Sequence, residues 1–544
     1  MTIQIFRARR AIIGYPYIHE SPVTVVVRDG VIEEIYDDDT VATNYPDAEN
    51  VIIPEDQVLL PGLVDTHVHV NEPGRTDWEG FASATRAAAA GGVTTLVDMP
   101  LNSIPSTVTM DALAPKRKIA EDKAKISVGF WGGVVPENLG TGDLRELWDD
   151  GRVFGFKCFL LHSGVDEFQP LTQEQLVQAM QEIAEFDGLI IVHAEDAEVI
   201  RQSEEAQQAR GGITEVYASF EASRLPEAEH KAVKTVIDAA ERTGCRAHIL
   251  HLSDSGSLEL LRDAQRRGVR ITAETCPHYL SLLSEEIQNG ATQYKCCPPI
   301  RSAANRERLW AGLVDGVIST VVSDHSPCTE ELKKFAKAHL ATDSGGASEA
   351  GDLIRSGGAT DTGWSALDAQ GNNLGGAGAD GRGSEGSFGE AWGGVASVQL
   401  GLPVVWSQAR LRGLALTDVV RWMCTNPARW CGLQDRGAIT PGARADFVAI
   451  SADDAFVVLP EKLHHKNKVS AYAQRALAGV VQNTWIGGQV VFRADASRTA
   501  ETKAKDLSEE DFFPGPIVPL LDRPDGADDR SGVATGDDQD AEGE

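Results

Sequence analysis

The chain is poor in paired cysteines, long apolar runs and positive charge. Its eight cysteines are spread over 544 residues without a CxxC pair, which favours reduced thiols in the cytoplasm over a disulfide framework. No run approaches the roughly 18 apolar residues of a membrane span, and the start lacks the apolar core of a signal peptide. With 50 basic against 81 acidic residues, the net charge of −31 argues against binding nucleic-acid phosphates. We therefore expect a cytoplasmic protein with neither a membrane nor a nucleic-acid partner.

Strand-like and helix-like segments alternate through the middle of the chain. After the strand-like segment that contains His67, seven more follow, at 93–99, 126–134, 153–161, 189–195, 247–253, 269–276 and 320–326. Helix-like segments lie between them, for example at 79–90, 173–186, 227–242, 255–267 and 303–315. Strict alternation indicates parallel β/α units. Eight such units predict an α/β fold, a TIM-type (β/α)8 barrel over residues 61–430.

The flanks and one internal stretch depart from this alternation. Residues 1–60 and 431–500 carry short β-patterned pieces, which predict one small sheet from each end of the chain. Residues 345–389 hold 14 glycines in 45 positions, a composition that predicts a flexible insertion, after which a helix is expected at 392–399. Residues 501–544 form a C-terminal extension. From about 523 it has eight acids and two arginines, which predict a disordered acidic tail.

Polar residues stand at the ends of the predicted barrel strands. His67 and His69, at i and i+2, point to the same side of their strand because strand side chains alternate faces. A TIM-type barrel places its active site at the C-terminal ends of its strands. The polar residues found there are His67, His69, Lys157, His193, His251 and Asp324. Each alone can also be structural: a core histidine, a snorkelling lysine or a capping aspartate. Together they indicate a metal centre.

Four histidines and an aspartate suit Zn²⁺, with Mn²⁺ or Co²⁺ as alternatives. They exceed what one tetrahedral ion requires and therefore predict two divalent metal ions per chain. Lys157 cannot ligate a cation as an ammonium, but burial beside Phe154, Phe156 and Phe159 would lower its pKa toward the neutral amine. A neutral amine can take up CO2. The resulting N6-carboxylysine has two oxygens, one for each metal ion.

Ten motifs that span roughly residues 50–450 resemble the cyclic-amidohydrolase branch of the amidohydrolase superfamily, and most closely the allantoinases. The motifs are PGLVDTHVHVNEPGRTDWEG, AAAAGGVTTLVDMPLNS, GFKCF, VHAE, HLS, ETCPHYL, CCPPIR, VVSDHSPC, AWGG and GARADF. The resemblance implies a binuclear barrel, a small β-sandwich domain made by the two flanks, and a homotetramer. It also implies an order of ligands. His67, His69 and Asp324 would hold one metal ion, His193 and His251 the other, and carboxylated Lys157 would bridge them.

The reaction implied by the resemblance is hydrolytic ring opening of allantoin to allantoate in purine catabolism, by a metal-activated bridging hydroxide. Asp324 is the expected catalytic residue, because it would accept a proton and pass it to the leaving ring nitrogen. The substrate-binding residues expected from the resemblance and from neighbouring positions are Arg75, Asn102, His162, Cys297 and Ser326. His162 stands five residues after Lys157, where hydantoinases usually place a tyrosine.

Three alternatives stay open at this point. Hydantoinases or dihydropyrimidinases share the chemistry, but the tyrosine that they usually carry is replaced by His162. Dihydroorotases usually place an arginine almost directly after the HxH motif, whereas here the arginine is Arg75. Some relatives lost their ligands and became non-catalytic scaffolds. All six ligand positions are filled in this chain, which favours an enzyme over a scaffold.

Overall fold

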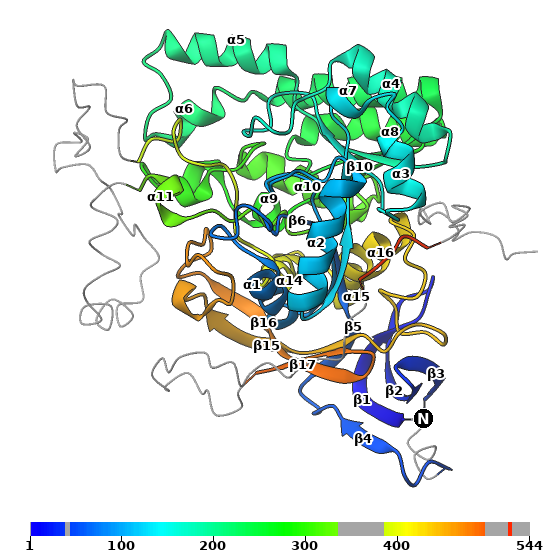
Figure 1. Cartoon of the computed structure of the whole chain (residues 1–544). Helices are drawn as coiled ribbons and strands as arrows, with labels where there is room; N and C mark the ends of the chain where they lie inside the picture. Colours follow the sequence, from blue (N-terminus) through cyan, green and yellow to red (C-terminus); the bar gives the residue numbers. More distant parts are fainter. Residues whose placement is uncertain (1, 38–43, 336–385, 495–519, 525–544) are drawn as a thin grey trace, which may run out of the picture.

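Parallel strands follow one another in chain order through the middle of the protein (Figure 1). The structure is a computed structural model that describes residues 2–37, 44–335, 386–494 and 520–524. The strands are β6 Leu63–Val68, β7 Val93–Asp98, β8 Ser127–Phe130, β9 Gly132–Gly133, β10 Phe156–Phe159, β11 Leu189–His193, β12 Arg246–Ile249, β13 Ile271–Thr275 and β14 Thr320–Val321. β6 to β8 form one parallel sheet and β9 to β14 another.

Backbone hydrogen bonds connect these two sheets at both junctions. β8 and β9 are separated only by Trp131, whose N–H donates to the carbonyl of Asp98 at 3.0 Å. At the other junction the N–H of His69 donates to the carbonyl of His325, just beyond β14, at 2.8 Å. Since β8 and β9 share one position, the strands occupy the eight positions of a TIM-type barrel. The predicted fold class is confirmed.

Helices follow the strands and surround the barrel (Figure 1). They are α1 Phe81–Ala90, α2 Met110–Lys123, α3 Asp143–Asp149, α4 Gln173–Ala184, α5 Ala197–Gln208, α6 Tyr217–Glu221, α7 Pro226–Thr243, α8 Leu258–Arg266, α9 Pro277–Ser281, α10 Ala303–Val314, α11 Glu330–Lys333, α14 Gly401–Leu411, α15 Leu416–Val420 and α16 Asn426–Trp430. In α4, Thr172 and Gln175 form a capping box that fixes the start of the helix. Its buried residues recur at helical spacing, so one face packs on the barrel.

The helix expected at 392–399 is wrong. This segment is extended, and its Val395 pairs in parallel with His325. A side chain at Gly394 would meet the backbone oxygen of Ser326 at 2.3 Å, and Gly394 has a φ of 154°, so only glycine fits there. Pairing with a distant segment therefore overrides the local helical pattern.

The predicted insertion at 345–389 is described only at its end, because residues 345–385 lie outside the described residues. Within the described part, Phe388 is fully buried. Its ring lies 5.2 Å from that of Tyr217 and 6.2 Å from that of Phe220. The chain is therefore anchored on α6 immediately before it reaches the barrel again.

Strands from both ends of the chain build the smaller sheet (Figure 1). They are β1 Ile3–Ile13, β2 His19–Arg28, β3 Val31–Tyr36, β4 Glu49–Ile52, β5 Val58–Pro61, β15 Phe447–Val457, β16 Ala476–Ile486 and β17 Gln489–Arg493. β5 joins the two sets, because it pairs with β1 on one side and β15 on the other. The sheet bends until Ile32 N–H in β3 donates to the carbonyl of Ala443 at 2.8 Å. Two layers thus enclose one apolar core, the small β-sandwich domain.

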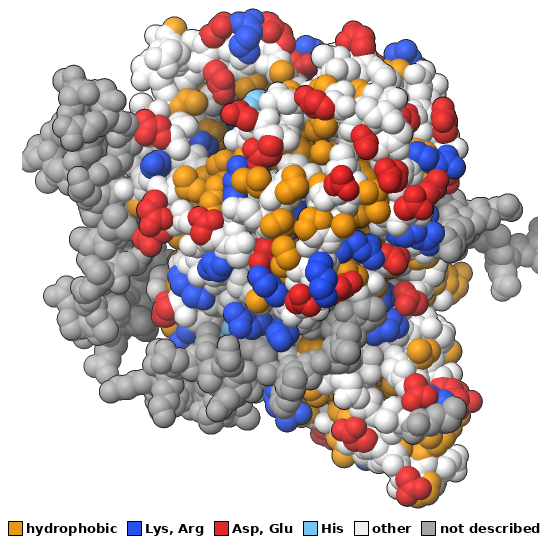
Figure 2. All heavy atoms as spheres, in the orientation of Figure 1, with side chains coloured by type: hydrophobic (Ala, Val, Ile, Leu, Met, Phe, Trp, Pro, Cys, Tyr) orange, Lys and Arg blue, Asp and Glu red, His pale blue; other side chains and the backbone are white. Residues whose placement is uncertain are grey.

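The surface mixes both signs of charge. On the face shown in Figure 2, acidic and basic side chains are interspersed, and hydrophobic side chains gather across its middle. Of the helices that the structure describes, none is both long and apolar enough to cross a membrane. The C-terminal residues 520–524 lie against the barrel, where Leu521 N–H donates to the carbonyl of Val128 at 2.8 Å. The acidic tail beyond residue 524 lies outside the described residues.

Candidate metal centre

The six side chains predicted as metal ligands meet around one cavity. It has a volume of about 400 Å³ and lies at the C-terminal end of the barrel strands. The predicted ligands that line it are His67, His69, Lys157, His193, His251 and Asp324. They come from β6, β10, β11 and the segments just after β6, β12 and β14. The barrel therefore brings together residues that are up to 257 positions apart in the chain.

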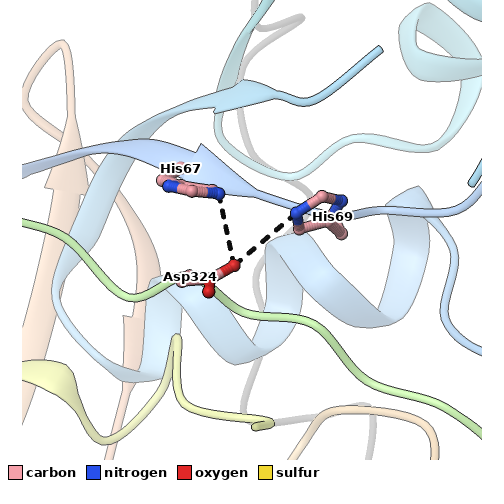
Figure 3. A group of neighbouring side chains, drawn as sticks. All are labelled: His67, His69 and Asp324. Carbon is pink, nitrogen blue, oxygen red and sulfur yellow. Dashed lines mark ion pairs between the residues drawn. The ribbon is translucent and has the colours of Figure 1, made fainter. Parts of the chain in front are cut away.

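His67, His69 and Asp324 form the tightest part of this set (Figure 3). Asp324 Oδ1 lies 3.2 Å from His67 Nε2 and 3.6 Å from His69 Nε2. Both histidines point toward the carboxylate, His67 from β6 and His69 from the segment just after it, as their i, i+2 spacing predicts (Figure 3). One ligand atom from each residue lies within 4.8 Å of the others. This arrangement can hold a single cation.

The remaining histidines face this group from the opposite strands. The rings of His193 and His251 are 4.5 Å apart between centroids, and that of His251 is 5.5 Å from that of His67. Lys157 lies among them, buried, with its Nζ 4.6 Å from the centroid of the Phe159 ring. Burial lowers the pKa of Lys157 to about 8, although nearby carboxylates oppose the shift. Burial therefore favours the neutral amine of Lys157 over the ammonium.

The donor set fits divalent metal ions. Among the described residues, His67 Nε2 and His251 Nδ1 are buried and have no hydrogen-bond partner. Buried polar atoms in folded proteins usually have one, so these nitrogens are suited to a ligand. Burial also holds the pKa of His67, His69 and His251 well below the usual range, and repulsion from Lys157 adds to the effect. Neutral imidazoles are the form that binds a metal ion.

Two buried carboxylates contact the histidines on the side away from the cavity, and neither was predicted from the sequence. Glu274 Oε1 lies 2.5 Å from His67 Nδ1 and accepts the backbone N–H of His251 at 3.2 Å. Glu195 Oε2 lies 2.7 Å from His193 Nε2 and also accepts from Arg224 at 2.7 Å. Carboxylates in this position fix the orientation of ligating histidines. The available signal was spacing, since Glu195 follows His193 by two residues within the strand-like segment predicted at 189–195.

Three residues with strained backbone conformations also line this cavity. Asn102, His251 and Asp324 have φ angles of 65°, 37° and 42°, in the left-handed region that side chains rarely adopt. Such conformations cost free energy and persist where the surrounding structure fixes them, often at functional sites. Here they turn three side chains toward the cavity at strand ends.

The environment of Asp324 suits proton transfer. Burial raises the pKa of its carboxyl group to about 7, although the Ser326 hydroxyl, which donates to Oδ1 at 2.7 Å, opposes the shift. A carboxylate with a pKa near the working pH can both accept and release a proton.

Four of the five predicted substrate contacts line the cavity, namely Asn102, His162, Cys297 and Ser326. Arg75 does not. Its guanidinium pairs with Glu167 and donates to the backbone carbonyl of Asn102 at 3.0 Å. Arg75 therefore supports the loop that carries Asn102, and the structure gives it no place in the cavity wall.

Comparisons with known proteins agree with this geometry. Residues 58–491 match the model of the amidohydrolase family. An allantoinase of Streptomyces avermitilis is 49% identical over 455 residues, covering 84% of this chain and 88% of the relative. An allantoinase of Saccharomyces cerevisiae is 40% identical over 80% of this chain and 82% of its own length. One of Arabidopsis thaliana is 36% identical over 86% of this chain and 84% of its own.

Solved structures show the same architecture. An L-hydantoinase (dihydropyrimidinase) from Arthrobacter aurescens superposes with a TM-score of 0.74 and 26% identity, covering 90% of this chain and 96% of that chain. A dihydropyrimidinase from Brevibacillus agri gives a TM-score of 0.73 at 22% identity, covering 90% and 95%. Because the second structure is only 22% identical to this chain, its similarity supports the fold alone.

Proposed function

Because this chain belongs to the amidohydrolase family, we propose that it opens the hydantoin ring of allantoin by hydrolysis and releases allantoate, a step of purine catabolism. The observation that carries the proposal is the gathering of six metal-type side chains around one cavity of about 400 Å³. The curated relatives named allantoinase, at 36–49% identity over most of the chain, support the choice of substrate.

The family is metal-dependent, and the finer assignment is our proposal. His67, His69 and Asp324 would hold one ion, and His193 and His251 a second. Zn²⁺ suits this set of nitrogen and oxygen donors, with Mn²⁺ or Co²⁺ as alternatives. When bound, two such ions lower the pKa of a shared water toward neutrality and polarise a carbonyl group.

Lys157 would join the two ligand groups as N6-carboxylysine. Its neutral amine adds to CO2, so that an N–C bond forms and one proton is released, leaving a carbamate with one negative charge. The buried position and the lowered pKa of about 8 support this reaction, because they make the free amine available. A carbamate also removes the positive charge that would otherwise face two cations.

Asp324 would move the proton. Its carboxylate accepts a proton from the attacking water and delivers it to the ring nitrogen that leaves when the amide bond breaks. The Ser326 hydroxyl, which donates to Asp324 Oδ1, holds the carboxylate in place during this transfer. The raised pKa of Asp324, about 7, supports a group that can take either state.

The remaining cavity residues would position the substrate. Asn102 and Ser326 offer an amide and a hydroxyl for the ring, and the backbone at Cys297 offers a further polar edge. The His162 side chain is 54% exposed, so we place it at the cavity mouth. We propose that Arg75 acts through Asn102 rather than on the substrate. A homotetramer and a cytoplasmic location remain proposals; light scattering on the purified protein tests the first.

A substrate panel tests the function. The metal-loaded protein is incubated with allantoin, hydantoin, dihydrouracil and dihydroorotate in parallel, and ring opening is followed for each. We expect allantoin to have the highest kcat/KM, and chelation of the metal to abolish its turnover. Faster opening of hydantoin or dihydrouracil would support a hydantoinase instead, and faster opening of dihydroorotate a dihydroorotase. No turnover of any of the four by metal-loaded protein would support a non-catalytic scaffold.

A further inference from the structure

A second group of metal-type side chains shares Asp324. One ligand atom each from Cys276, His278 and Asp324 lies within 4.8 Å of the others, and all three residues are buried. Cys276 directly follows β13, and His278 lies in α9. Among the described residues, this group and that of His67, His69 and Asp324 are the two sets of three such residues this close together. The metal centre proposed above uses neither Cys276 nor His278.

His278 gives an independent sign of a ligand. The residue is 0% exposed, and neither of its ring nitrogens has a hydrogen-bond partner among the described residues. Its ring packs edge-on against that of Tyr279, with the centroids 4.2 Å apart. A buried imidazole normally forms at least one hydrogen bond or binds a metal ion. Two unpartnered nitrogens beside a thiol and a carboxylate are therefore suited to binding a cation.

The charges around Cys276 favour a cation as well. The carboxylates of Asp324, Glu274 and Asp65 act electrostatically on its buried thiol group. The same negative charges attract a cation, and a thiol that coordinates a divalent ion gives up its proton. One proton is released for each ion bound.

We propose that Cys276, His278 and Asp324 form an inhibitory site for a thiophilic divalent cation, such as Cd²⁺ or Zn²⁺ in excess over the two resident ions. A thiolate, an imidazole and a carboxylate are the ligands that such ions prefer. Ligand atoms around a tetrahedral zinc ion lie about 3.5 Å apart, and those of this group lie within 4.8 Å of one another, so the group must close by about 1.3 Å at most.

Occupation of this site would stop turnover through Asp324. A carboxylate that ligates the extra ion cannot accept the proton of the attacking water. This consequence rests on the proposed function, whereas binding of the ion does not. Asp324 lines the cavity and Cys276 and His278 do not, so the ion would enter through the cavity and past Asp324.

Titration of the metal-loaded enzyme with CdCl2 tests the site. Metal analysis after each step verifies that the two resident ions remain. We expect one further Cd²⁺ per chain, an ultraviolet charge-transfer band from cadmium to thiolate, and a parallel fall in allantoin hydrolysis. Cys276→Ala should abolish the band, and His278→Gln should weaken binding of the further ion by about tenfold or more. Cys245→Ala removes a buried thiol that does not line the cavity and should titrate like the parent.

Three outcomes would overturn the proposal. The parent protein binds no third ion; the band survives in Cys276→Ala but disappears in Cys297→Ala, which removes the half-buried thiol of the cavity wall; or the ion binds through Cys276 without slowing hydrolysis. The absorbance is read whether or not the parent opens allantoin. A negative result for the cation site can therefore be distinguished from a negative result for allantoin hydrolysis.

Discussion

The mouth of the barrel and the core of the small sheet are equally buried and opposite in chemistry. At the mouth, His67, Lys157 and Glu274 are at most 1% exposed. In the small sheet, Phe6 packs edge-on against Phe447 and Trp485, with ring centroids 4.9 and 5.7 Å away. Burying an aromatic ring stabilises the fold by roughly 2–3 kcal/mol. Burying an ionisable group costs about 1.4 kcal/mol for each unit by which its pKa moves against the charged form.

The two regions therefore have different roles: the barrel mouth holds the candidate site, and the core of the small sheet stabilises the fold. Burial raises the pKa of Glu274 to about 8, so burying this carboxyl group at the site costs free energy of folding. The apolar core of the sheet, which contains Phe6, Phe447 and Trp485, offsets such costs. Changes at the barrel mouth should alter metal content and turnover, and changes in the sheet core should alter stability.

The largest effect is expected from Lys157→Ala. Without the bridging group, the two-metal centre should be lost, and allantoin turnover should fall by about 1,000-fold or more, because the metals activate the water. The melting temperature of the metal-free protein should stay the same or rise, since a buried amine has been removed. Metal analysis, initial rates and thermal unfolding measure the three quantities.

Adding bicarbonate to the parent protein, or a small carboxylate to Lys157→Ala, distinguishes a carbamate at Lys157 from an unmodified lysine with a structural role. Metal-free parent protein should regain activity faster when bicarbonate accompanies the metal. A small carboxylate such as acetate should restore part of the turnover of Lys157→Ala, because it supplies the same pair of oxygens. A Lys157→Ala protein that binds two metal ions and works at the parental rate would show that Lys157 bridges nothing.

The next effect is expected in the sheet. Phe447→Ala should lower the free energy of unfolding by about 3–5 kcal/mol, because it leaves a cavity against Phe6. Turnover per metal-loaded chain at low temperature should stay at the parental value. Trp485→Phe keeps most of the apolar volume and should cost less. A Phe447→Ala protein that stays folded yet loses its metal ions would show that the two regions are not separable.

The smallest effect concerns pH. Burial alone raises the pKa of Glu195, but the charge of Arg224 and the hydrogen bond with His193 outweigh burial and bring the pKa to about 2. A depressed pKa adds stability above the ordinary value of 4.5, and this stability is lost as the pH falls toward 2. Between pH 6 and pH 3.5 the metal-free parent should therefore lose about 1 kcal/mol more than Glu195→Gln, measured by urea unfolding.

Glu198 provides the matched control for this comparison. Hydrogen bonds from Arg201 and Gln202 also lower its pKa to about 2, but its side chain is exposed on the surface of α5. Solvent screens an exposed ion pair, so Glu198→Gln should follow the pH dependence of the parent closely. If Glu195→Gln and Glu198→Gln showed the same pH dependence of the free energy of unfolding, burial of the Glu195–Arg224 pair would have no influence on the loss of stability at acid pH.

Local pattern determined much of this protein. Apolar runs with a period of two, separated by helical stretches, predicted the strands of the barrel, and His67 and His69 share a face because of the same period. All six ligand candidates stand at the ends of such runs, so strand position alone selected residues that line one cavity. Strand position alone did not select the four substrate-binding candidates that line the cavity. Their selection also required the resemblance to known motifs or their proximity to those motifs.

Only the tertiary structure decided which distant segments meet. Glu274 supports His67 from 207 positions away, and the pattern around Glu274 records nothing of that partner. The extended course near Val395 follows from its pairing with His325, against a local pattern that favoured a helix. Arg75 faces Glu167 rather than the cavity. Periodicity fixes which face of an element a side chain occupies, whereas the hydrogen bonds that satisfy a buried polar group depend on what the closed barrel places opposite it.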